Sequence, residues 1–196
     1  MDLCPASVAL PGIDHRPDWL SPIEAEGLFD ALHEGVPWEV HRIRLFGRRV
    51  DSPRLSCWMG DEDAAYRYSG TRFEPHPWPP ILLDVRKRLE AECRASFNSV
   101  LANLYRDGRD AMGWHRDDEP ELGDAPLIAS VSLGATRRFL LKDAHGVRHP
   151  IELTNGDLLL MSGDSQRRYR HALPRTTKPV GPRINLTFRN VLPKAS

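Results

Sequence analysis

The chain has 196 residues, of which 40% are apolar and 28% charged, a composition typical of a globular domain with a sizeable core. No apolar run approaches the roughly eighteen residues of a membrane span, and Met1 to Pro17 lack the pattern of a signal peptide. The 27 basic and 27 acidic residues cancel, which argues against a general nucleic-acid-coating protein. Three widely spaced cysteines and no Cys-x-x-Cys pair favour free thiols over disulfides or a cysteine zinc site.

Two helices are predicted early in the chain. Ser21-Pro22-Ile23-Glu24 has the pattern of a capping box with proline in the first turn, and the helix should continue to about Gly35. A second helix is predicted from Pro80 to about Ala95, because its apolar residues recur at helical spacing: Leu82, Val85, Leu89 and Cys93.

The remainder is predicted to be mainly short strands separated by turns. The expected strands are Asn98 to Tyr105, Ile128 to Leu133, Arg138 to Lys142, Asp157 to Met161 and Arg183 to Val191. Two helices followed by many strands indicate an α+β protein with a double-layered β-sandwich. In the last strand, apolar and polar residues alternate from Ile184 to Arg189, which suits a strand lining a polar pocket.

Basic residues are concentrated in two stretches. Gln166 to Ser196 contains eight Lys or Arg and no Asp or Glu, and a second group comprises Arg42, Arg44, Arg48, Arg49 and Arg54. Solvated loops and edge strands would explain both stretches as well as an anionic partner would, so both interpretations stay open.

His115 and Asp117 form a His-x-Asp pair, whose side chains would face one side of a strand or extended loop. Together with a distant second histidine, they would occupy one face of an octahedral Fe(II) and leave three positions open. Such a pair is common by chance, and by itself is more often a surface pair.

The third ligand must come from His145, His149 or His171. His145 lies in a predicted hairpin turn, and His149 follows it closely. His171 lies between the strand that ends near Met161 and the last strand, so we favour it.

Arg183 and Arg189 lie six residues apart and should therefore face the same side of the last strand. Guanidinium groups suit carboxylates, and an unpaired buried charge is costly. A dicarboxylate co-substrate would provide the partner. Upstream, the alternation around Leu104 points the polar side chains of Asn103 and Tyr105 the same way.

These residues resemble the AlkB family of Fe(II)- and 2-oxoglutarate-dependent dioxygenases. The resemblance covers about residues 46 to 191. It rests on Asn103-Leu104-Tyr105, His115-Arg116-Asp117-Asp118-Glu119, Ser130 to Gly134, Asn155-Gly156-Asp157, His171 and Arg183-Ile184-Asn185-Leu186-Thr187-Phe188-Arg189.

The resemblance implies a double-stranded β-helix (jelly-roll) core with the N-terminal helices packed on one sheet. It also implies Fe(II) on His115, Asp117 and His171, and 2-oxoglutarate whose far carboxylate pairs with Arg183. Asn103 and Tyr105 would help Arg183, and Thr187 and Arg189 would line the same pocket. With O₂, the implied reaction demethylates alkylated bases such as 1-methyladenine and 3-methylcytosine, releasing formaldehyde and succinate.

The N-terminal half resembles the DNA-repair branch of the family. Residues 1–78 would form an extension and a nucleotide-recognition lid, and residues 79–196 the catalytic core of a single domain. Phe46, with Gly47 and Arg48, would fill the gap left by a flipped-out base in DNA. Tyr66, Arg67 and Tyr68 would form the lid, and Asp118 would contact the edge of the base. Core and lid positions remain equally open for Trp58.

Three alternatives remain. The same chemistry could act on methylated RNA or on a protein side chain. A degenerate family member could serve as a binding module, although it should then lack an iron ligand or a co-substrate arginine. A cupin-like sandwich with another metal would not require the paired arginines. We expect a monomer in the cytoplasm, or in the nucleus of a eukaryote.

Overall fold

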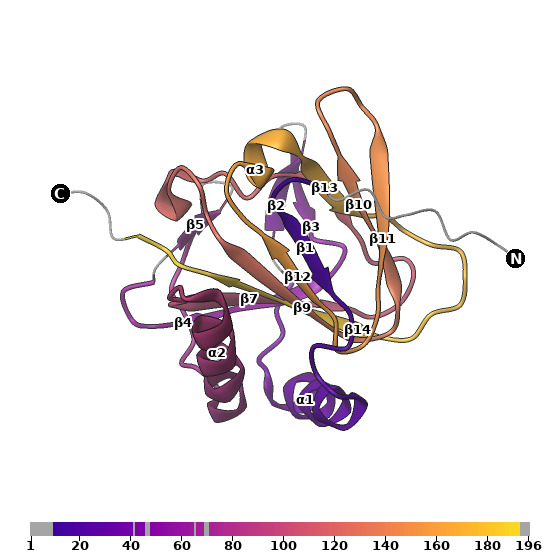
Figure 1. The fold of residues 1–196 in the computed structure, drawn as a ribbon. Helices are drawn as coiled ribbons and strands as arrows, with labels where there is room; N and C mark the ends of the chain where they lie inside the picture. The colour runs from indigo at the N-terminus through magenta and orange to yellow at the C-terminus, as the bar shows by residue number, and fades with distance from the viewer. Residues whose placement is uncertain (1–9, 41, 46–47, 65, 69–70, 193–196) are drawn as a thin grey trace, which may run out of the picture.

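The computed structural model describes residues 10–40, 42–45, 48–64, 66–68 and 71–192. For residues 42–45, 48–50, 66–68 and 71–73 it describes the backbone alone. Two antiparallel sheets face each other (Figure 1). The large sheet has six strands in the order β1-β12-β9-β14-β7-β4: Ile13–Arg16, Leu158–Met161, Ile128–Gly134, Arg183–Arg189, Ser99–Tyr105 and Leu55–Gly60. The small sheet has four strands in the order β11-β10-β13-β8: Arg148–Leu153, Arg137–Lys142, Arg170–Leu173 and Met112–His115.

Four short strands form two separate hairpins beside the sandwich: β2 (Arg42–Leu45) with β3 (Arg48–Asp51), and β5 (Tyr66–Tyr68) with β6 (Thr71–Phe73). Two short helical turns lie in the connections, η1 at Pro120–Leu122 and α3 at Ser165–Arg168. The expected α+β jelly roll is confirmed.

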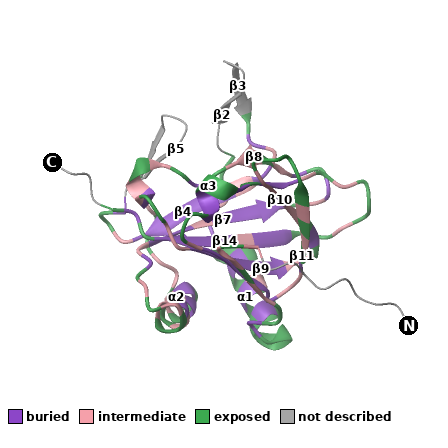
Figure 2. Ribbon diagram, turned by 45° about the horizontal axis from the view of Figure 1, so that its top comes forward, coloured by how far each residue is buried: buried purple, intermediate pink, exposed green. Residues whose placement is uncertain are grey.

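The two longer helices, α1 (Pro22–Gly35) and α2 (Pro80–Cys93), lie together on one side of the large sheet (Figure 1). Their apolar faces, including Leu28, Leu32, Leu82 and Leu89, join the sheet residues in one buried cluster, and the strands of the large sheet are largely buried (Figure 2). The helices therefore cover the outer face of the large sheet, and its inner face remains for the site.

The helix ends follow local rules. The capping box at Ser21 is present, because the Glu24 N–H donates to Ser21 Oγ at 3.4 Å and the Ser21 N–H donates to Glu24 Oε2 at 2.8 Å. α2 ends two residues earlier than expected, because Arg94 has a left-handed backbone with φ of 51° that cannot continue the helix.

The ends of two strands also differ slightly from the expected ones. The Asn98 side chain donates to the Val191 carbonyl at 2.8 Å and accepts from the Val191 N–H at 2.7 Å. These side-chain bonds join the expected ends of the two strands, where the Asn98 N–H also donates to the Arg189 carbonyl at 3.1 Å. β7 begins at Ser99 and β14 ends at Arg189.

β14 lies in the large sheet between β9 and β7, paired with both. Ile184, Leu186 and Phe188 point into the helix-covered core, as the alternation predicted. The polar residues between them point toward the small sheet. One strand thus serves the core on one face and the site on the other.

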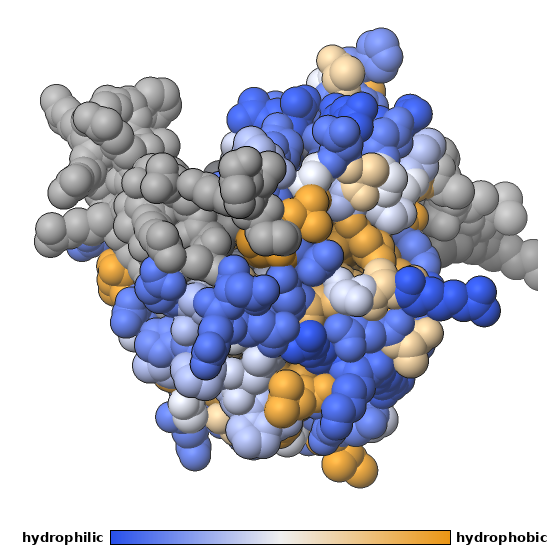
Figure 3. Space-filling view, turned by 90° about the vertical axis from the view of Figure 1, so that its left-hand side faces the viewer, coloured by the Kyte–Doolittle hydropathy of each residue, from blue (hydrophilic) through white to orange (hydrophobic). Residues whose placement is uncertain are grey.

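No helix in the described part of the chain is long and apolar enough to cross a membrane. The face of the molecule in Figure 3 is mainly hydrophilic, with apolar residues scattered over it.

Candidate metal and co-substrate site

The small sheet brings the three candidate metal ligands together. His115 ends β8 and lies directly opposite His171 on the neighbouring strand β13, with ring centroids 4.1 Å apart. Asp117 lies two residues beyond β8, and its Oδ1 is 3.9 Å from His115 Nε2. The three ligand atoms lie within 4.8 Å of one another. This convergence agrees with the choice of His171 over the two other histidines.

His145 and His149 lie elsewhere. His145 is exposed in the turn between β10 and β11. His149 Nε2 is 3.1 Å from Asp143 Oδ2 on the same hairpin. Neither belongs to the cluster at His115.

Burial lowers the pKa of His171 to about 3, helped by nearby His115, and it also lowers the pKa of His115. Both imidazoles are therefore neutral near pH 7 and able to donate a lone pair to a metal. Burial raises the pKa of Asp117, but the charge and hydrogen bond of Arg189 together with the nearby His171 and His115 outweigh burial and hold that pKa well below its usual value. The carboxylate is consequently ionised.

The environment also fixes the orientation of two candidate ligands. His115 Nδ1 lies 2.8 Å from the Gly113 carbonyl oxygen, so Nδ1 carries the proton and donates it to that oxygen. The lone pair of Nε2 is then available to a metal. Arg189 Nη2 donates to Asp117 Oδ2 at 2.9 Å, so Oδ1 is the oxygen nearer to His115. Two imidazoles and one carboxylate in this arrangement fit Fe(II).

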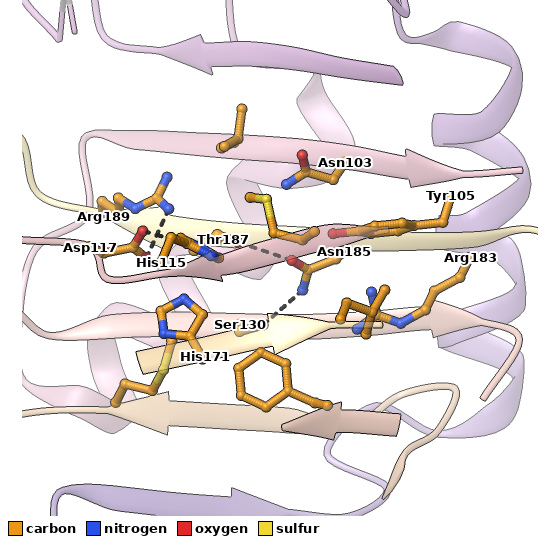
Figure 4. A pocket seen from close by; sticks show the side chains of 15 residues that line it. Asn103, Tyr105, His115, Asp117, Ser130, His171, Arg183, Asn185, Thr187 and Arg189 are labelled. Carbon is orange, nitrogen blue, oxygen red and sulfur yellow. Dashed lines mark hydrogen bonds and ion pairs between the residues drawn. The ribbon is translucent and has the colours of Figure 1, made fainter. Parts of the chain in front are cut away.

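A pocket extends from these residues between the sheets (Figure 4). His115, Asp117 and Arg189 lie at one end, and Arg183 and Tyr105 at the other. Its lining includes every residue expected to bind the co-substrate: Asn103, Tyr105, Arg183, Thr187 and Arg189.

Arg183 is 2% exposed, and burial lowers its pKa to about 10, so it remains cationic at neutral pH. Its Nη2 donates to Ser132 Oγ at 2.9 Å, and its guanidinium lies 5.5 Å from the centre of the Tyr105 ring. Its buried Nε has no hydrogen-bond partner within the part of the chain that the structure describes. No carboxylate pairs with Arg183 among the described residues. A buried cation with a spare donor fits an anionic ligand such as the far carboxylate of 2-oxoglutarate.

The remaining pocket residues were missing from the expected set. Asn185 donates to Ser130 Oγ at 2.7 Å and accepts from Thr187 Oγ1 at 3.1 Å. Its place between Arg183 and Thr187 on one face of the strand was the signal for including it. Ser130 on β9 also lines the pocket, and the others are apolar residues from five further strands: Leu101, Met112, Phe139, Met161 and Leu173. No local pattern marks them as pocket residues.

Arg54, from the second basic stretch, is buried rather than solvated. Its Nε donates to Asn103 Oδ1 at 2.6 Å, and its Nη1 donates to Ser52 Oγ at 3.0 Å. Arg54 therefore fixes the amide of Asn103 where that residue faces the pocket.

The structure describes only some of the expected substrate residues. Phe46 and Gly47 lie outside the described residues. Arg48 belongs to β3, and Tyr66, Arg67 and Tyr68 form β5, where the backbone alone is described. Asp118 is exposed beside Asp117. Trp58 is 3% exposed and packs with Leu122 and Val191, so it is a core residue.

Residues 12–189 match the family model of the 2OG-Fe(II) oxygenase superfamily, and the chain therefore belongs to this superfamily. The alpha-ketoglutarate-dependent dioxygenase alkB homolog 3 of Bos taurus is 40% identical over 181 residues, covering 87% of this chain and 63% of that protein. The DNA oxidative demethylase ALKBH2 of Mus musculus is 38% identical over 182 residues, covering 87% of this chain and 76% of that protein.

Within the superfamily, the chain is a member of the AlkB family. It spans less than two thirds of the length of the alkB homolog 3 relatives that it matches. A solved structure of OsALKBH1 shares the fold, with a TM-score of 0.67 at 20% identity, covering 93% of this chain and 99% of that one.

Proposed function

We propose that this protein is an Fe(II)- and 2-oxoglutarate-dependent dioxygenase that demethylates N-alkylated bases in DNA, with 1-methyladenine and 3-methylcytosine as substrates and formaldehyde and succinate as products. The observation that carries the proposal is one pocket with His115, Asp117 and His171 at one end and, at the other, a buried Arg183 that pairs with no carboxylate in the described part of the chain. One of the two relatives described above, ALKBH2 of Mus musculus, is named as a DNA oxidative demethylase.

In this proposal His115, Asp117 and His171 hold Fe(II). Arg183 binds the far carboxylate of 2-oxoglutarate, with Tyr105 and Asn103 beside it and Thr187 and Arg189 along the pocket. Bound iron and 2-oxoglutarate supply the oxidation of the N-methyl carbon by O₂. The hydroxymethyl group formed then leaves as formaldehyde, which restores the unmodified base.

The protein's own residues bind the metal and the co-substrate and orient them. The ionised Asp117 and the neutral histidines need no proton exchange before they bind a metal cation. The Arg183 cation selects a dicarboxylate, because a ligand without a second carboxylate leaves its spare donor unpaired. Burial of the pocket between two sheets limits the access of water.

The outer face of the small sheet supports a polyanionic substrate. Lys142 pairs across β10 with Arg148 on one side and with Arg170 on the other, so three cations form one row. Like charges directly opposite each other destabilise a sheet. No ion pair with a carboxylate joins any of the three among the described residues. A row of this kind suits the phosphates of a nucleic acid.

This row adjoins the candidate metal site. Lys142 Nζ lies 4.5 Å from the centre of the Trp114 ring, and Arg170 Nη2 donates to the Trp114 carbonyl at 2.9 Å. Trp114 immediately precedes His115. If the row bound phosphates, the bound nucleic-acid strand would therefore lie near the pocket.

The lid remains part of the proposal. We propose that Phe46, Gly47 and Arg48 occupy the gap of a flipped-out base, and that Tyr66, Arg67 and Tyr68 cover the base. The exposed carboxylate of Asp118 lies next to Asp117 and suits a base that methylation has made cationic. Residues 1–78 would supply this lid, and residues 79–196 the catalytic core.

The test incubates purified protein with Fe(II), 2-oxoglutarate and matched methylated and unmethylated oligonucleotides. We expect formaldehyde and the repaired base, by mass spectrometry, from the methylated oligonucleotide alone. Loss of both products in His171→Ala would tie them to the metal site. Succinate formation without any repaired base would overturn the substrate assignment while leaving the dioxygenase chemistry in place.

Methylated RNA remains the second substrate class, because the cationic row suits either backbone. The same assay should offer 1-methyladenine in DNA and RNA of identical sequence. A higher kcat/KM for RNA would reassign the substrate, and turnover of a methylated peptide alone would reject both nucleic acids.

A further inference from the structure

Gln166 contacts the metal site from outside, although it belongs to none of the sets described above. It lies in α3, between β12 and the strand that carries His171, and it is 3% exposed. Its Oε1 accepts a hydrogen bond from the Asp117 backbone N–H at 3.1 Å, across 49 residues of chain. This bond joins the segment before His171 to the residue that offers the carboxylate.

The Asp117 N–H needs such a partner. β8 ends at His115, so Asp117 lies beyond the backbone pairing of the small sheet while being 4% exposed. A buried N–H that loses its acceptor keeps the cost of its desolvation without the compensating hydrogen bond. By accepting this hydrogen bond, the Gln166 oxygen favours one position of the Asp117 backbone.

Asp117 is consequently held at two points. Gln166 holds its backbone, and Arg189 holds its carboxylate at Oδ2. His115 differs, because its ring is oriented by a carbonyl of its own strand, that of Gly113. Asp117 therefore depends on a distant segment for its placement.

The other end of the Gln166 amide is weakly bound. Nε2 donates to Met161 Sδ at 3.6 Å, and a thioether is a poor acceptor. A side chain that served packing alone would not need a buried amide here. The strong contact of this amide is the one with Asp117.

We propose that Gln166 is a positioning residue for the metal, which keeps Asp117 in register with the α3–His171 segment. The inference rests on the proposed function, since it requires that Asp117 and His171 bind one metal ion. Substitution of a residue that orients a metal ligand commonly weakens metal binding roughly 10–100-fold. We expect an effect of that size for Gln166.

The test uses Co(II) as a spectroscopic probe, titrated into metal-free protein and followed by its visible absorption. Gln166→Met keeps the length of the side chain and removes the acceptor. We expect Co(II) to bind roughly 10–100-fold more weakly than to the unmodified protein. Gln166→Glu keeps an acceptor oxygen and should restore most of the affinity.

Ser165→Ala is the matched control. Ser165 is buried in the same short helix, and its hydroxyl finds no hydrogen-bond partner among the residues whose structure is described. The Co(II) affinity of Ser165→Ala should stay within about twofold of that of the unmodified protein, since the hydroxyl that it removes makes no hydrogen bond to a metal ligand in the described part of the chain. Equal weakening in Ser165→Ala and Gln166→Met would mean that α3 acts through packing alone, and would overturn the proposal.

Unmodified affinity in a folded Gln166→Met would overturn it equally. If Gln166→Met does not fold, Gln166→Ala takes its place with the same expected loss and the same opposite outcome. Urea unfolding with excess chelator identifies which variants are folded. The Co(II) measurement needs no substrate, so its result is independent of the demethylation assay. If the unmodified protein itself bound no Co(II), the proposed function and this inference would both fall.

Discussion

Arg189 and Asp117 form a buried ion pair at 2.9 Å, between the last residue of β14 in the large sheet and a residue two positions beyond the end of β8 in the small sheet. Both side chains are nearly inaccessible, with exposed fractions of 5% and 6%. The pair therefore links the two sheets of the sandwich at the candidate metal site.

Loss of one partner of this pair should be costly. Arg189→Met leaves the Asp117 carboxylate buried without its cation, and we expect a loss of about 3–5 kcal/mol in the unfolding free energy of the metal-free protein. Urea denaturation with excess chelator measures the change. Adding Asp117→Asn to Arg189→Met should recover part of the loss, because the second substitution removes the unpaired charge. A double variant less stable than Arg189→Met would contradict this account.

Arg183 should control the binding of 2-oxoglutarate. Arg183→Met removes a charge-assisted hydrogen bond of about 1.5–3 kcal/mol, which corresponds to a rise in the KM for 2-oxoglutarate of roughly 10–150-fold. Succinate formation at varied 2-oxoglutarate measures it. Arg138→Met is the control, since Arg138 is exposed and pairs with Glu152 on the outer face. An unchanged KM in Arg183→Met would assign the far carboxylate to another residue.

Asp157 should make stability depend on acid pH. Its buried carboxylate accepts bonds from the Thr154 N–H and Oγ1 at 2.9 Å and from the Asp18 N–H at 3.2 Å, and His15 Nε2 lies at 2.9 Å. Burial raises the pKa of Asp157, but these bonds outweigh burial and lower that pKa in the folded protein. The stabilisation is therefore complete above the unfolded-state pKa of about 3.9 and is lost as the pH falls through the lower folded-state pKa.

Asp157→Asn should accordingly lower the unfolding free energy by about 1.5–3 kcal/mol at pH 7, and the difference should shrink as the pH falls below about 4. Urea unfolding at a series of pH values measures both quantities. Asp84→Asn, at an exposed residue of α2, should change stability by less than about 0.5 kcal/mol. A difference that stayed constant down to pH 2 would show that the charge of Asp157 contributes nothing.

The cationic row should determine the salt dependence of nucleic-acid binding. For a single strand, each phosphate contact adds about 0.7 to the slope of log affinity against log salt concentration. Replacing any one of Lys142, Arg148 or Arg170 by Gln should lower the slope by about that amount.

Fluorescence anisotropy with an unmodified labelled oligonucleotide, at several salt concentrations, measures these slopes. Lys87→Gln is the control, because Lys87 is an exposed residue of α2, on the far side of the large sheet, and pairs with Asp84. Slopes that fall as much in Lys87→Gln as in the row variants would indicate general electrostatic attraction without a defined contact.

The sequence by itself determined the features whose signals are local. The capping box at Ser21 and the 3.6-residue spacing from Leu82 to Cys93 predicted both longer helices, since helix formation depends on neighbouring residues. Alternation along β14 predicted which side chains enter the core and which line the pocket. The spacing of two between His115 and Asp117 indicated a pair of candidate metal ligands, because residues at that spacing in an extended chain face the same side.

Buried strands gave weaker signals. β4 was missed because its residues are buried on both faces, from Ser56 to Gly60, so apolar and polar residues do not alternate. The burial of Arg54 was also unexpected, because its partner Asn103 lies 49 residues away. Composition around Arg54 resembles that of a solvated basic stretch and cannot reveal a distant acceptor.

Only the tertiary structure decided which distant groups meet. Pairing of β13 with β8 sets His171 opposite His115, and a buried contact across 72 residues joins Arg189 to Asp117. The position of Gln166 at the Asp117 N–H had no sequence signal at all. Such contacts form because burial between the sheets removes water, so that enclosed polar groups must find partners within the protein, and no local window of sequence shows which distant group will be near.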